Sequence, residues 1–282
     1  MHVPVLVDEV VDYLNLKLGG TYIDATLNGG GHARAILKKI GPNGKVLGIE
    51  WDESIADSIK KEKTPNLIVV KDSYTNMSNI AKKNGLMKID GVLFDFGMSS
   101  WHLDASGRGF SFAKDEVLDM RYSKGTGMTA AEIVNTYSED RLSKLFLEYG
   151  EERRARLFAR ALVRARKIAR IITTGDLLKA CGSVPRFGKK HFATQIFQAL
   201  RIEVNNELEN VTAGLRAAMG LVVPNGRVVA ISFHSLEDRI VKQMFNTGGR
   251  VLTKKPITAY QQEVALNPRS RSARLRVWES HD

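Results

Sequence analysis

Short apolar runs alternate with amphipathic stretches along the first half of the chain, which predicts a parallel β-sheet covered by helices. Two amphipathic stretches, Ala33–Ile40 and Ser54–Lys61, are predicted as helices, each followed by turn residues. The chain is therefore predicted to have an α/β fold. Four apolar runs are predicted as its strands: Thr21–Thr26, Lys45–Glu50, Asn66–Val70 and Asp90–Asp95.

Strand patterns resume only about 130 residues later, a gap far longer than a crossover helix needs. The late candidates are Gly226–Phe233, Arg250–Lys254 and Ala273–Glu279. The intervening chain begins with a Gly- and Ser-rich loop and becomes helical from Thr129 to about Val211. We therefore predict a discontinuous sheet domain at 1–112 and 212–282, interrupted by an inserted loop and helical substrate-binding subdomain at 113–211.

Composition narrows the class of protein. Hydrophobic residues make up 43% of the 282 residues and charged residues 26%, which is typical of a globular protein. No apolar run approaches the ~18–20 residues of a membrane span, and the first ten residues carry no Lys or Arg of a secretory signal. The single cysteine, Cys181, excludes an internal disulfide and is predicted to be a buried hydrophobe. We expect a cytoplasmic protein without a membrane partner.

The net charge of +11 is concentrated in the insert. Residues 121–206 hold 17 Lys and Arg against 8 Asp and Glu, which accounts for +9 of that charge. A polyanionic partner that contacts the insert is one interpretation, and a solvated basic face is the other.

One stretch of the insert orders its cations at helical spacing. Arg153, Arg156, Arg160, Arg164 and Lys167 fall within an arc of roughly 80° on a helix, and no acid interrupts residues 153–170. The stripe favours contact with phosphates, although acids elsewhere in the fold could pair with it instead. The apolar side chains predicted to face the core from this helix are Leu157, Phe158, Ala161, Ala165 and Ile168. A second helix, Phe192–Val211, carries apolar residues four apart and is predicted to be core.

A glycine run, Gly29-Gly30-Gly31, follows the first predicted strand and precedes a helix. Such a loop brings backbone N–H groups close to a ligand. The run lacks both the G-x-G-x-x-G spacing of dinucleotide sites and the G-K-[ST] of phosphate-binding loops. Asp24 just before it would repel a pyrophosphate but could meet an ammonium group. These features favour S-adenosyl-L-methionine over a nicotinamide cofactor.

Acids end the neighbouring strands, since Glu50 closes the second and Asp95 the fourth. Ligands of such sheets bind outside the carboxyl ends of the strands, where Glu50 could accept hydrogen bonds from ribose hydroxyls. Alternatively, Glu50 caps the following helix and His32 is a packing residue at a helix start.

Candidate substrate residues follow the later strands. Asp95-Phe96-Gly97-Met98-Ser99-Ser100 suits a base with exocyclic polar groups. The following loop sets Arg108 and Arg121 among aromatics, which suits a flipped nucleobase, unless the aromatics simply pack on the loop itself. His234 ends the fifth strand, and Arg269 and Arg271 form a basic turn near the C-terminus. No His, Cys or carboxylate cluster has metal-ligand spacing, so no metal is expected.

The segments resemble the RsmH (formerly MraW) family, methyltransferases of small-subunit ribosomal RNA, over almost the whole chain. SFHSLEDR and LDMR are very specific to that family. The matching stretches are HVPVLVDEV at 2–10, GGGH at 29–32, DFGMSS at 95–100, RGFSF at 108–112, LDMR at 118–121, YGEER at 149–153, FQALRIEVNNEL at 197–208, SFHSLEDRIVK at 232–242 and NPRSRSARLR at 267–276.

The resemblance implies a class I, Rossmann-like S-adenosylmethionine-dependent methyltransferase fold with an inserted helical domain. It implies methylation of the exocyclic N4 amine of a cytidine in the decoding region of 16S rRNA, within the small ribosomal subunit. The family usually has Asp where Glu50 stands, and Pro-Gln where Trp101-His102 stand. The cofactor contacts that it implies fall on Gly30, Gly31, His32, Glu50, Tyr74, Asp95 and His102.

For catalysis we expect Asp95 to accept a hydrogen bond from the amine, with Ser99 or His234 orienting the base or taking the proton. RNA contacts are expected from the cationic stripe with Arg108, Arg121, Arg269 and Arg271. A non-catalytic ribosome-assembly factor and, less favoured, a nicotinamide-dependent oxidoreductase are the rival hypotheses. The sequence leaves open whether the protein is a monomer or a homodimer.

Overall fold

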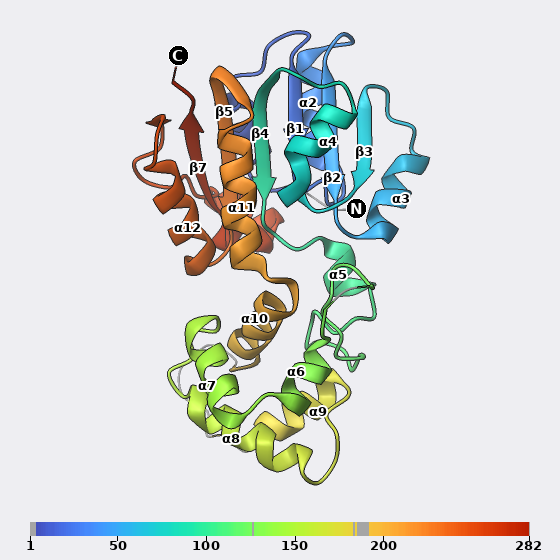
Figure 1. Ribbon diagram of the computed structural model, residues 1–282, viewed down its shortest axis with the longest axis vertical. Coiled ribbons are helices and arrows are strands. Elements are labelled where there is room, and N and C mark those ends of the chain that lie inside the picture. Colours follow the sequence, from blue (N-terminus) through green and yellow to red (C-terminus); the bar gives the residue numbers. More distant parts are fainter. Residues whose placement is uncertain (1–3, 126, 183, 185–191, 282) are drawn as a thin grey trace. The chain divides into compact units, whose positions relative to one another are not determined.

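The computed structural model describes residues 4–125, 127–182, 184 and 192–281 (Figure 1). The chain forms two compact units: unit 1 comprises Met1–Ser99 and Leu208–Asp282, and unit 2 comprises Ser100–Glu207. We describe each unit by itself. The described part of the chain has no helix that is both long and apolar enough to cross a membrane.

Unit 1 is built on a twisted mixed sheet, which confirms the predicted α/β class. Within the described residues the sheet has seven strands in the order β3-β2-β1-β4-β5-β7-β6. The first five strands run parallel to their neighbours, while β7 is antiparallel to both β5 and β6. The strands are β1 Thr21–Asp24, β2 Lys45–Glu50, β3 Leu67–Lys71, β4 Ile89–Asp95, β5 Val222–Ser232, β6 Arg250–Val251 and β7 Arg274–Glu279.

Helices cover both faces of this sheet (Figure 1). On one face α4, α11 and α12 bury Ile80, Leu215 and Phe245 against Val92 and Phe94 of β4. On the other face α1 and α2 pack against each other, and α2 also contacts β1 and β2. The helices of this unit are α1 Val7–Tyr13, α2 Gly31–Ile40, α3 Glu53–Lys61, η1 Tyr74–Asn76, α4 Met77–Lys83, α11 Glu207–Met219, α12 Ser235–Phe245, α13 Gln261–Leu266 and η2 Pro268–Ser272.

The strand order reverses between β1 and β4, because the chain continues from β1 to β2 on one side and returns to β4 on the other. A ligand crevice forms outside the carboxyl ends of the strands at such a switch point. Asp24, Glu50 and Asp95 are the last residues of β1, β2 and β4. The sheet topology therefore brings these three acids to one edge.

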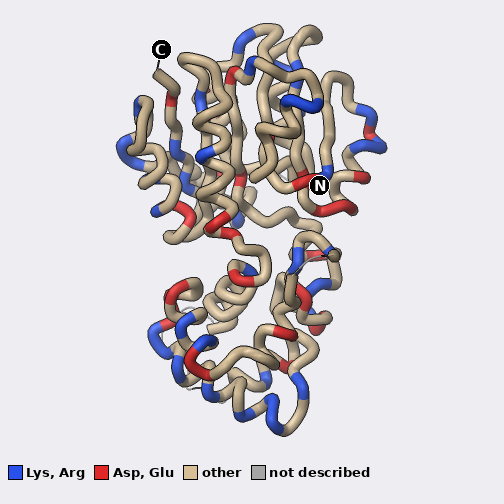
Figure 2. The backbone as a smooth tube through the Cα atoms, in the orientation of Figure 1, with Lys and Arg blue, Asp and Glu red and all other residues tan. Residues whose placement is uncertain are grey.

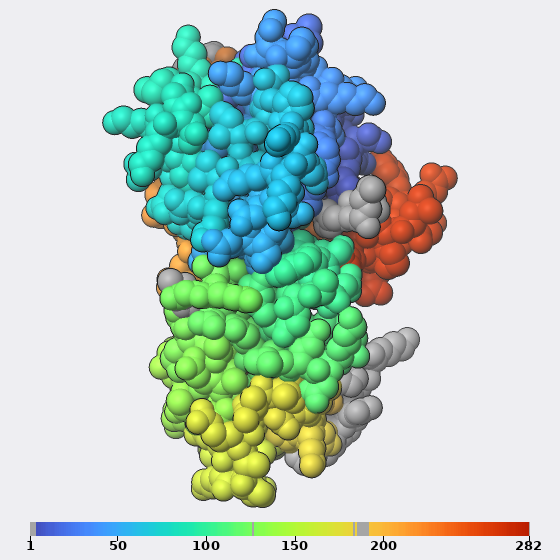
Figure 3. All heavy atoms as spheres, turned by 90° about the vertical axis from the view of Figure 1, so that its right-hand side faces the viewer, coloured from blue at the N-terminus to red at the C-terminus, as the bar shows by residue number. Residues whose placement is uncertain are grey.

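Unit 2 combines helices with the long loop that follows α5. Thr174 at the start of α9 holds this loop: its hydroxyl accepts from the N–H of Glu116 (3.0 Å) and donates to the carbonyl of Lys114 (2.8 Å). Figure 3 shows the loop (green) and α9 (yellow) as one continuous surface. The helices of this unit are α5 Ser100–Asp104, α6 Ala130–Thr136, α7 Glu139–Glu148, α8 Ala155–Arg166, α9 Thr174–Cys181 and α10 Phe192–Asn205.

Residues 100–112, which the sequence assigned to the sheet domain, lie in unit 2. The physical reason is their packing: the Phe110 ring stacks on Tyr122 at 5.2 Å, and the Phe112 ring contacts Phe197 edge-on at 5.4 Å. The loop after β4 is thus part of the inserted unit from its first residues.

The single helix predicted over Phe192–Val211 is two helices, α10 and α11. Asn206 between them has a φ of 49°, a left-handed conformation that Asn tolerates better than most residues. Of the apolar residues spaced four apart, Phe192, Ile196 and Leu200 are buried in α10 as expected, whereas Val204 and Leu208 are only half-buried.

The predicted core face of α8 is right for Phe158, which is buried, and wrong for the two large aliphatic residues. Leu157 is 47% exposed and Ile168, beyond the helix end, is 90% exposed. Unit 2 packs a neighbouring apolar line of the helix, which consists of Ala155, Phe158, Ala159 and Leu162 and shares only Phe158 with the predicted face. Periodicity alone could not choose between lines that lie on adjacent faces of one helix.

Candidate functional site

The glycine run forms the turn from β1 into α2. Asn28 and Gly30 have φ values of 49° and 71°, so the chain reverses through the left-handed region that Gly adopts without strain. Gly31 begins α2, and a Cβ there would lie 2.7 Å from Cγ of Pro4. The first turn of α2 therefore presents backbone N–H groups at the carboxyl end of β1.

Glu50 fastens this loop to β2. One carboxylate oxygen accepts from the N–H of Asn28 (2.8 Å), and the other accepts from the N–H of Asp52 (2.9 Å). The side chain is 7% exposed, and burial raises its pKa to about 8, although those two N–H groups oppose the shift. Asp52, not Glu50, caps α3 by accepting from the N–H groups of Ser54 and Ile55. Each Glu50 oxygen keeps a lone pair for a further donor.

Three ionisable side chains lie buried around β1 and β4. The His32 Nε2–H donates to the carbonyl of Val5 (2.8 Å), since a carbonyl can only accept, and Nδ1 faces Asp95 Oδ2 at 3.7 Å. Asp95 Oδ1 accepts from the N–H of Gly97 (3.0 Å). Burial raises the pKa of Asp24 to about 6, with His32 lowering it and Asp95 raising it further. The interpretation of His32 as mere packing misses this proximity to Asp95.

Asp24 Oδ2 has no hydrogen-bond partner among the described residues, although the side chain is fully buried. A buried carboxylate oxygen without a donor is costly, and a cationic group would relieve the cost. The residues at the end of β1 therefore fit a ligand with an ammonium group.

Asn28 and Thr26 were missed as site residues. The Asn28 amide donates to the carbonyls of Asp95 and Gly97, each at 3.4 Å, and Thr26 Oγ1 accepts from the N–H of Asp95 (2.6 Å). Together they tie the β1 loop to the β4 loop. An Asn directly before a glycine run was the available signal, because Asn is a common left-handed residue at such turns.

His234 has a structural duty that its position after β5 did not reveal. His234 is the N-cap of α12, and its Nδ1 accepts a hydrogen bond from the N–H of Glu237 (3.4 Å). The Glu237 carboxylate in turn accepts from the N–H of Phe233 (2.8 Å). His234 Nε2 lies 3.0 Å from Glu237 Oε1 without the alignment of a hydrogen bond. Ser99 is buried at the end of unit 1.

Tyr74 and His102, two of the expected cofactor contacts, both pack against aromatic rings. Tyr74 follows β3 in unit 1, and its ring meets Phe94 edge-on at 5.6 Å. His102 belongs to unit 2, where its buried ring contacts Phe110 at 5.0 Å and Tyr122 at 4.9 Å. Packing accounts for the His102 ring without a ligand.

Two of the predicted RNA-binding arginines are used by the fold. Arg108 is 5% exposed, donates to the carbonyls of Arg121 and Tyr122, and lies 4.8 Å from the Trp101 ring centre. Arg121 forms a two-point ion pair with Asp119 at 2.7 and 2.9 Å. Both guanidinium groups thus have partners within the fold, and their phosphate contacts stay predictions.

The other predicted RNA contacts are on the surface. Figure 2 shows Lys and Arg gathered along α8 and the turn after it. Arg153 precedes α8 rather than lying on it, so the stripe is shorter than predicted. Arg160 is paired with Glu139 at 3.3 Å. The exposed members are Arg153, Arg156, Arg160, Arg164 and Lys167 in unit 2, and Arg269 and Arg271 in unit 1.

Comparison with known proteins decides the family. Residues 1–281 match the MraW methylase family. The chain belongs to that family. It is 43% identical to the ribosomal RNA small subunit methyltransferase H of Dictyoglomus thermophilum, over 100% of this chain and 97% of that protein. It is 44% identical to the protein of the same name from Desulfotalea psychrophila, over 99% of this chain and 98% of that protein.

Family membership confirms the resemblance found in the sequence and supports S-adenosyl-L-methionine as the cofactor. The residues fit it. Asp24 Oδ2 could accept a hydrogen bond from the ammonium group, and the Glu50 oxygens could accept from the ribose hydroxyls. The glycine turn lets a ligand lie close to the backbone.

Proposed function

We propose that this protein is an S-adenosyl-L-methionine-dependent methyltransferase that acts on the exocyclic N4 amine of a cytidine in the decoding region of 16S rRNA. The observation that carries the proposal is the acceptor at the switch point: Asp95 ends β4 beside β1, and among the described residues its Oδ2 has no hydrogen-bond donor, with His32 Nδ1 at 3.7 Å. That distance is too long for a hydrogen bond, so Oδ2 can accept one from an incoming amine.

Methyl transfer to nitrogen fits these residues better than transfer to cytosine carbon 5. Methylation of that carbon needs a nucleophile, ordinarily a thiolate, to activate the ring. The only cysteine of the chain is Cys181 in α9, which is fully buried, and burial raises its pKa to about 12. This thiol is inert at neutral pH.

Positioning and proton transfer are the contributions that the chain itself would make. When bound, S-adenosyl-L-methionine supplies an electrophilic methyl group on a sulfonium. The cytosine amine is a poor nucleophile because its lone pair is conjugated with the ring. Asp95 Oδ2 accepts a hydrogen bond from that amine, which frees the lone pair, and then takes the proton that the nitrogen must lose. His32 Nδ1 lies 3.7 Å from Oδ2. Because the Nε2–H of His32 donates to Val5, Nδ1 of the neutral ring is an acceptor and can receive a hydrogen bond from Oδ2 once that oxygen carries the proton.

The rival functions explain fewer features. A nicotinamide-dependent enzyme would bind a pyrophosphate at the glycine turn, and the carboxyl of Asp24 at the end of β1 would repel it. A non-catalytic assembly factor has no use for buried Asp24, Glu50 and Asp95 around one loop. RNA docking by α8 belongs to the proposal, because Arg156, Arg160 and Arg164 are exposed and no acid lies within that helix.

Cofactor affinity should depend on pH through Glu50. Burial raises the pKa of this carboxyl to about 8 in the folded protein, so its ionisation destabilises the unliganded fold as the pH rises toward 8. Ribose hydroxyls favour the ionised form. Binding of S-adenosylhomocysteine, measured by calorimetry, should therefore strengthen from pH about 6.5 to about 8, by at most about tenfold per pH unit, and then level off. Glu50→Gln should flatten the profile, and a wild-type affinity independent of pH would contradict the assignment.

Transfer of a labelled methyl group tests the function as a whole. Tritium from labelled cofactor should enter RNA of the small ribosomal subunit, presented as free RNA and as assembled particles. Large-subunit RNA is the matched control and should remain unlabelled. Cofactor binding without incorporation into any small-subunit substrate would support the assembly-factor hypothesis instead.

A further inference from the structure

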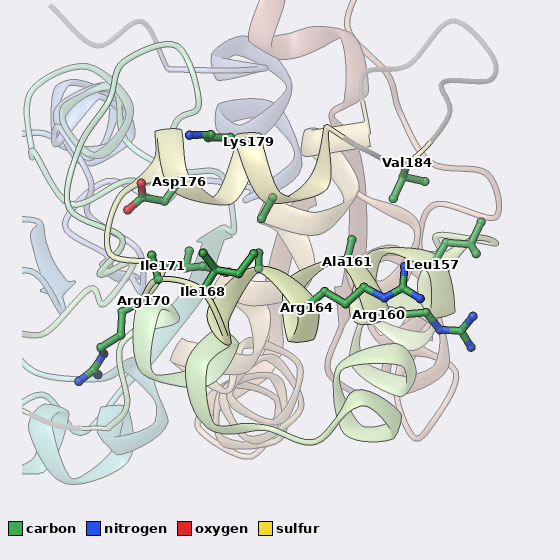
Figure 4. Close-up of a pocket in the computed structure, with 13 residues that line it drawn as sticks. Leu157, Arg160, Ala161, Arg164, Ile168, Arg170, Ile171, Asp176, Lys179 and Val184 are labelled. Carbon is green, nitrogen blue, oxygen red and sulfur yellow. The ribbon is translucent and has the colours of Figure 1, made fainter.

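Unit 2 has a groove between α8 and α9 that the proposed reaction does not use. Its volume is about 560 Å³, in the range of sites for small ligands. Helix α8 and the turn after it form the floor and one side, and α9 forms the other side (Figure 4). All of its lining residues belong to unit 2. We refer to it as the α8–α9 groove.

The floor of the α8–α9 groove is the apolar line of α8 that the core leaves unpacked. Leu157 and Ile168 contribute the large side chains, at 47% and 90% exposure, with Ala161 and Ala165 between them. Ala180 and Val184 complete it from the α9 side. Apolar surface of this kind gains free energy when a flat apolar face covers it.

Cations stand at both ends of this floor. Figure 4 shows Arg160 and Arg164 together near Leu157, whereas Arg170 and Lys179 lie toward the opposite end. Among the described residues, no carboxylate lies within ion-pair distance of Arg164, Arg170 or Lys179. The one acid in the lining, Asp176, is engaged in capping α9, because its Oδ2 accepts from the N–H groups of Ile172 and Thr173. The groove thus has an excess of positive charge.

We propose that the α8–α9 groove binds a short unpaired segment of the RNA substrate, with bases on the apolar floor and phosphates on the cations at the ends. This inference rests on the proposed function for the RNA but concerns a second contact, separate from the methylated base. The floor runs from Leu157 to Ile168, roughly 16 Å at the helical rise per residue, which is longer than one nucleotide and fits a short single strand. Guanidinium planes also stack on unpaired bases, which compensates for the absence of aromatic rings among the lining residues.

An acidic amphipathic peptide is the other occupant with complementary chemistry. The observations favour RNA for two reasons. The cations are grouped at the two ends rather than spread along one edge, where a helical peptide would need them (Figure 4). The cationic stripe also continues past the groove through Arg153 and Arg156, as a contact for a longer polyanion requires.

A variant that lacks the apolar floor but keeps the charge distinguishes a site that binds bases from one that binds only phosphates. In the full-length protein, Leu157→Ser with Ile168→Ser should weaken the binding of a fluorescent ten-nucleotide single strand about tenfold, as loss of one stacked base does. Binding of an abasic strand with the same phosphates should change less than about twofold. Fluorescence anisotropy at one fixed salt concentration measures both. If the double variant does not fold, Ile168→Ser alone can be tested in its place, because that side chain is 90% exposed and its loss should not disturb the core.

The matched control is Leu147→Ser with Leu266→Ser, which removes two exposed leucines outside the groove (55% and 87% exposed) and should leave both affinities unchanged. Equal losses for the two strands, or no loss for either, would overturn the inference. So would tighter binding of a Glu-rich amphipathic peptide that depends on Leu157 and Ile168. Because anisotropy needs no methyl transfer, a protein that binds as expected but transfers no methyl would refute the proposed function alone.

Discussion

Replacing Asp95 with Ala is expected to slow methyl transfer about 10²- to 10⁴-fold, the usual contribution of a general base. The loss arises because the amine then has no acceptor at the end of β4, while the backbone of the glycine turn stays in place. Affinity for S-adenosylhomocysteine should fall much less than the rate. Single-turnover transfer with calorimetry on the same preparations separates the two effects.

The control for this variant is Asp90→Asn, which changes an acid at the opposite end of the same strand. Asp90 accepts from the N–H of Thr21 (3.0 Å) and pairs with Lys17 (3.2 Å), so it belongs to the fold. Its loss should lower stability and leave the rate per folded molecule unchanged. An Asp95→Ala protein that binds cofactor normally and methylates at full rate would remove Asp95 from the mechanism.

Reversing two charges on α8 should give the largest effect on RNA affinity. Arg156→Glu with Arg160→Glu is expected to weaken RNA binding about 10- to 100-fold near 0.1 M salt, and to lower the slope of affinity against salt by about 1 to 2. Both side chains are exposed, so the fold should tolerate the change.

Lys38→Glu with Lys39→Glu is the matched control, because it makes the same change in net charge at exposed positions of α2 in unit 1. Equal weakening by the two double variants would mean that the protein binds RNA through its overall charge. Unchanged RNA affinity in the α8 variant would mean that the cationic stripe is only a solvated surface and does not bind RNA.

The parts of the fold that depend on local sequence could be predicted. Strand β2 has the predicted bounds, and β4 ends at Asp95 as expected, because a run of buried apolar residues followed by an acid and a turn signals a strand end. The prediction of β1 ran two residues too far. Thr26 and Ala25 continue the apolar pattern, but their backbone already turns toward the glycine run.

Long-range contacts explain what could not be predicted. Arg108 is an exposed cation by every local rule, yet carbonyls 13 and 14 residues away receive its guanidinium group inside unit 2. Asp238 of the SFHSLEDR motif likewise has a structural role. Its carboxylate pairs with Arg276 at 2.7 Å and so links α12 to β7. The left-handed Asn206 that divides α10 from α11 sits in a stretch with unbroken helical periodicity.

Local reasoning found the acids of the candidate site but not how they are connected. Asp24, Glu50 and Asp95 followed from the rule that parallel sheets bind ligands at their carboxyl ends. The interaction of His32 with both Val5 and Asp95 depends on residues 27 and 63 positions away in the chain. A sequence pattern does not carry that information without a known fold.

Identification of the methylated nucleoside tests the central claim most directly. After transfer from labelled cofactor to small-subunit RNA, the RNA is digested to nucleosides and the labelled one is identified by mass spectrometry. The proposed role of Asp95, whose Oδ2 has no hydrogen-bond donor among the described residues, and the burial of Cys181 predict N4-methylcytidine. Label recovered as 5-methylcytidine, or on a ribose hydroxyl, would contradict the account.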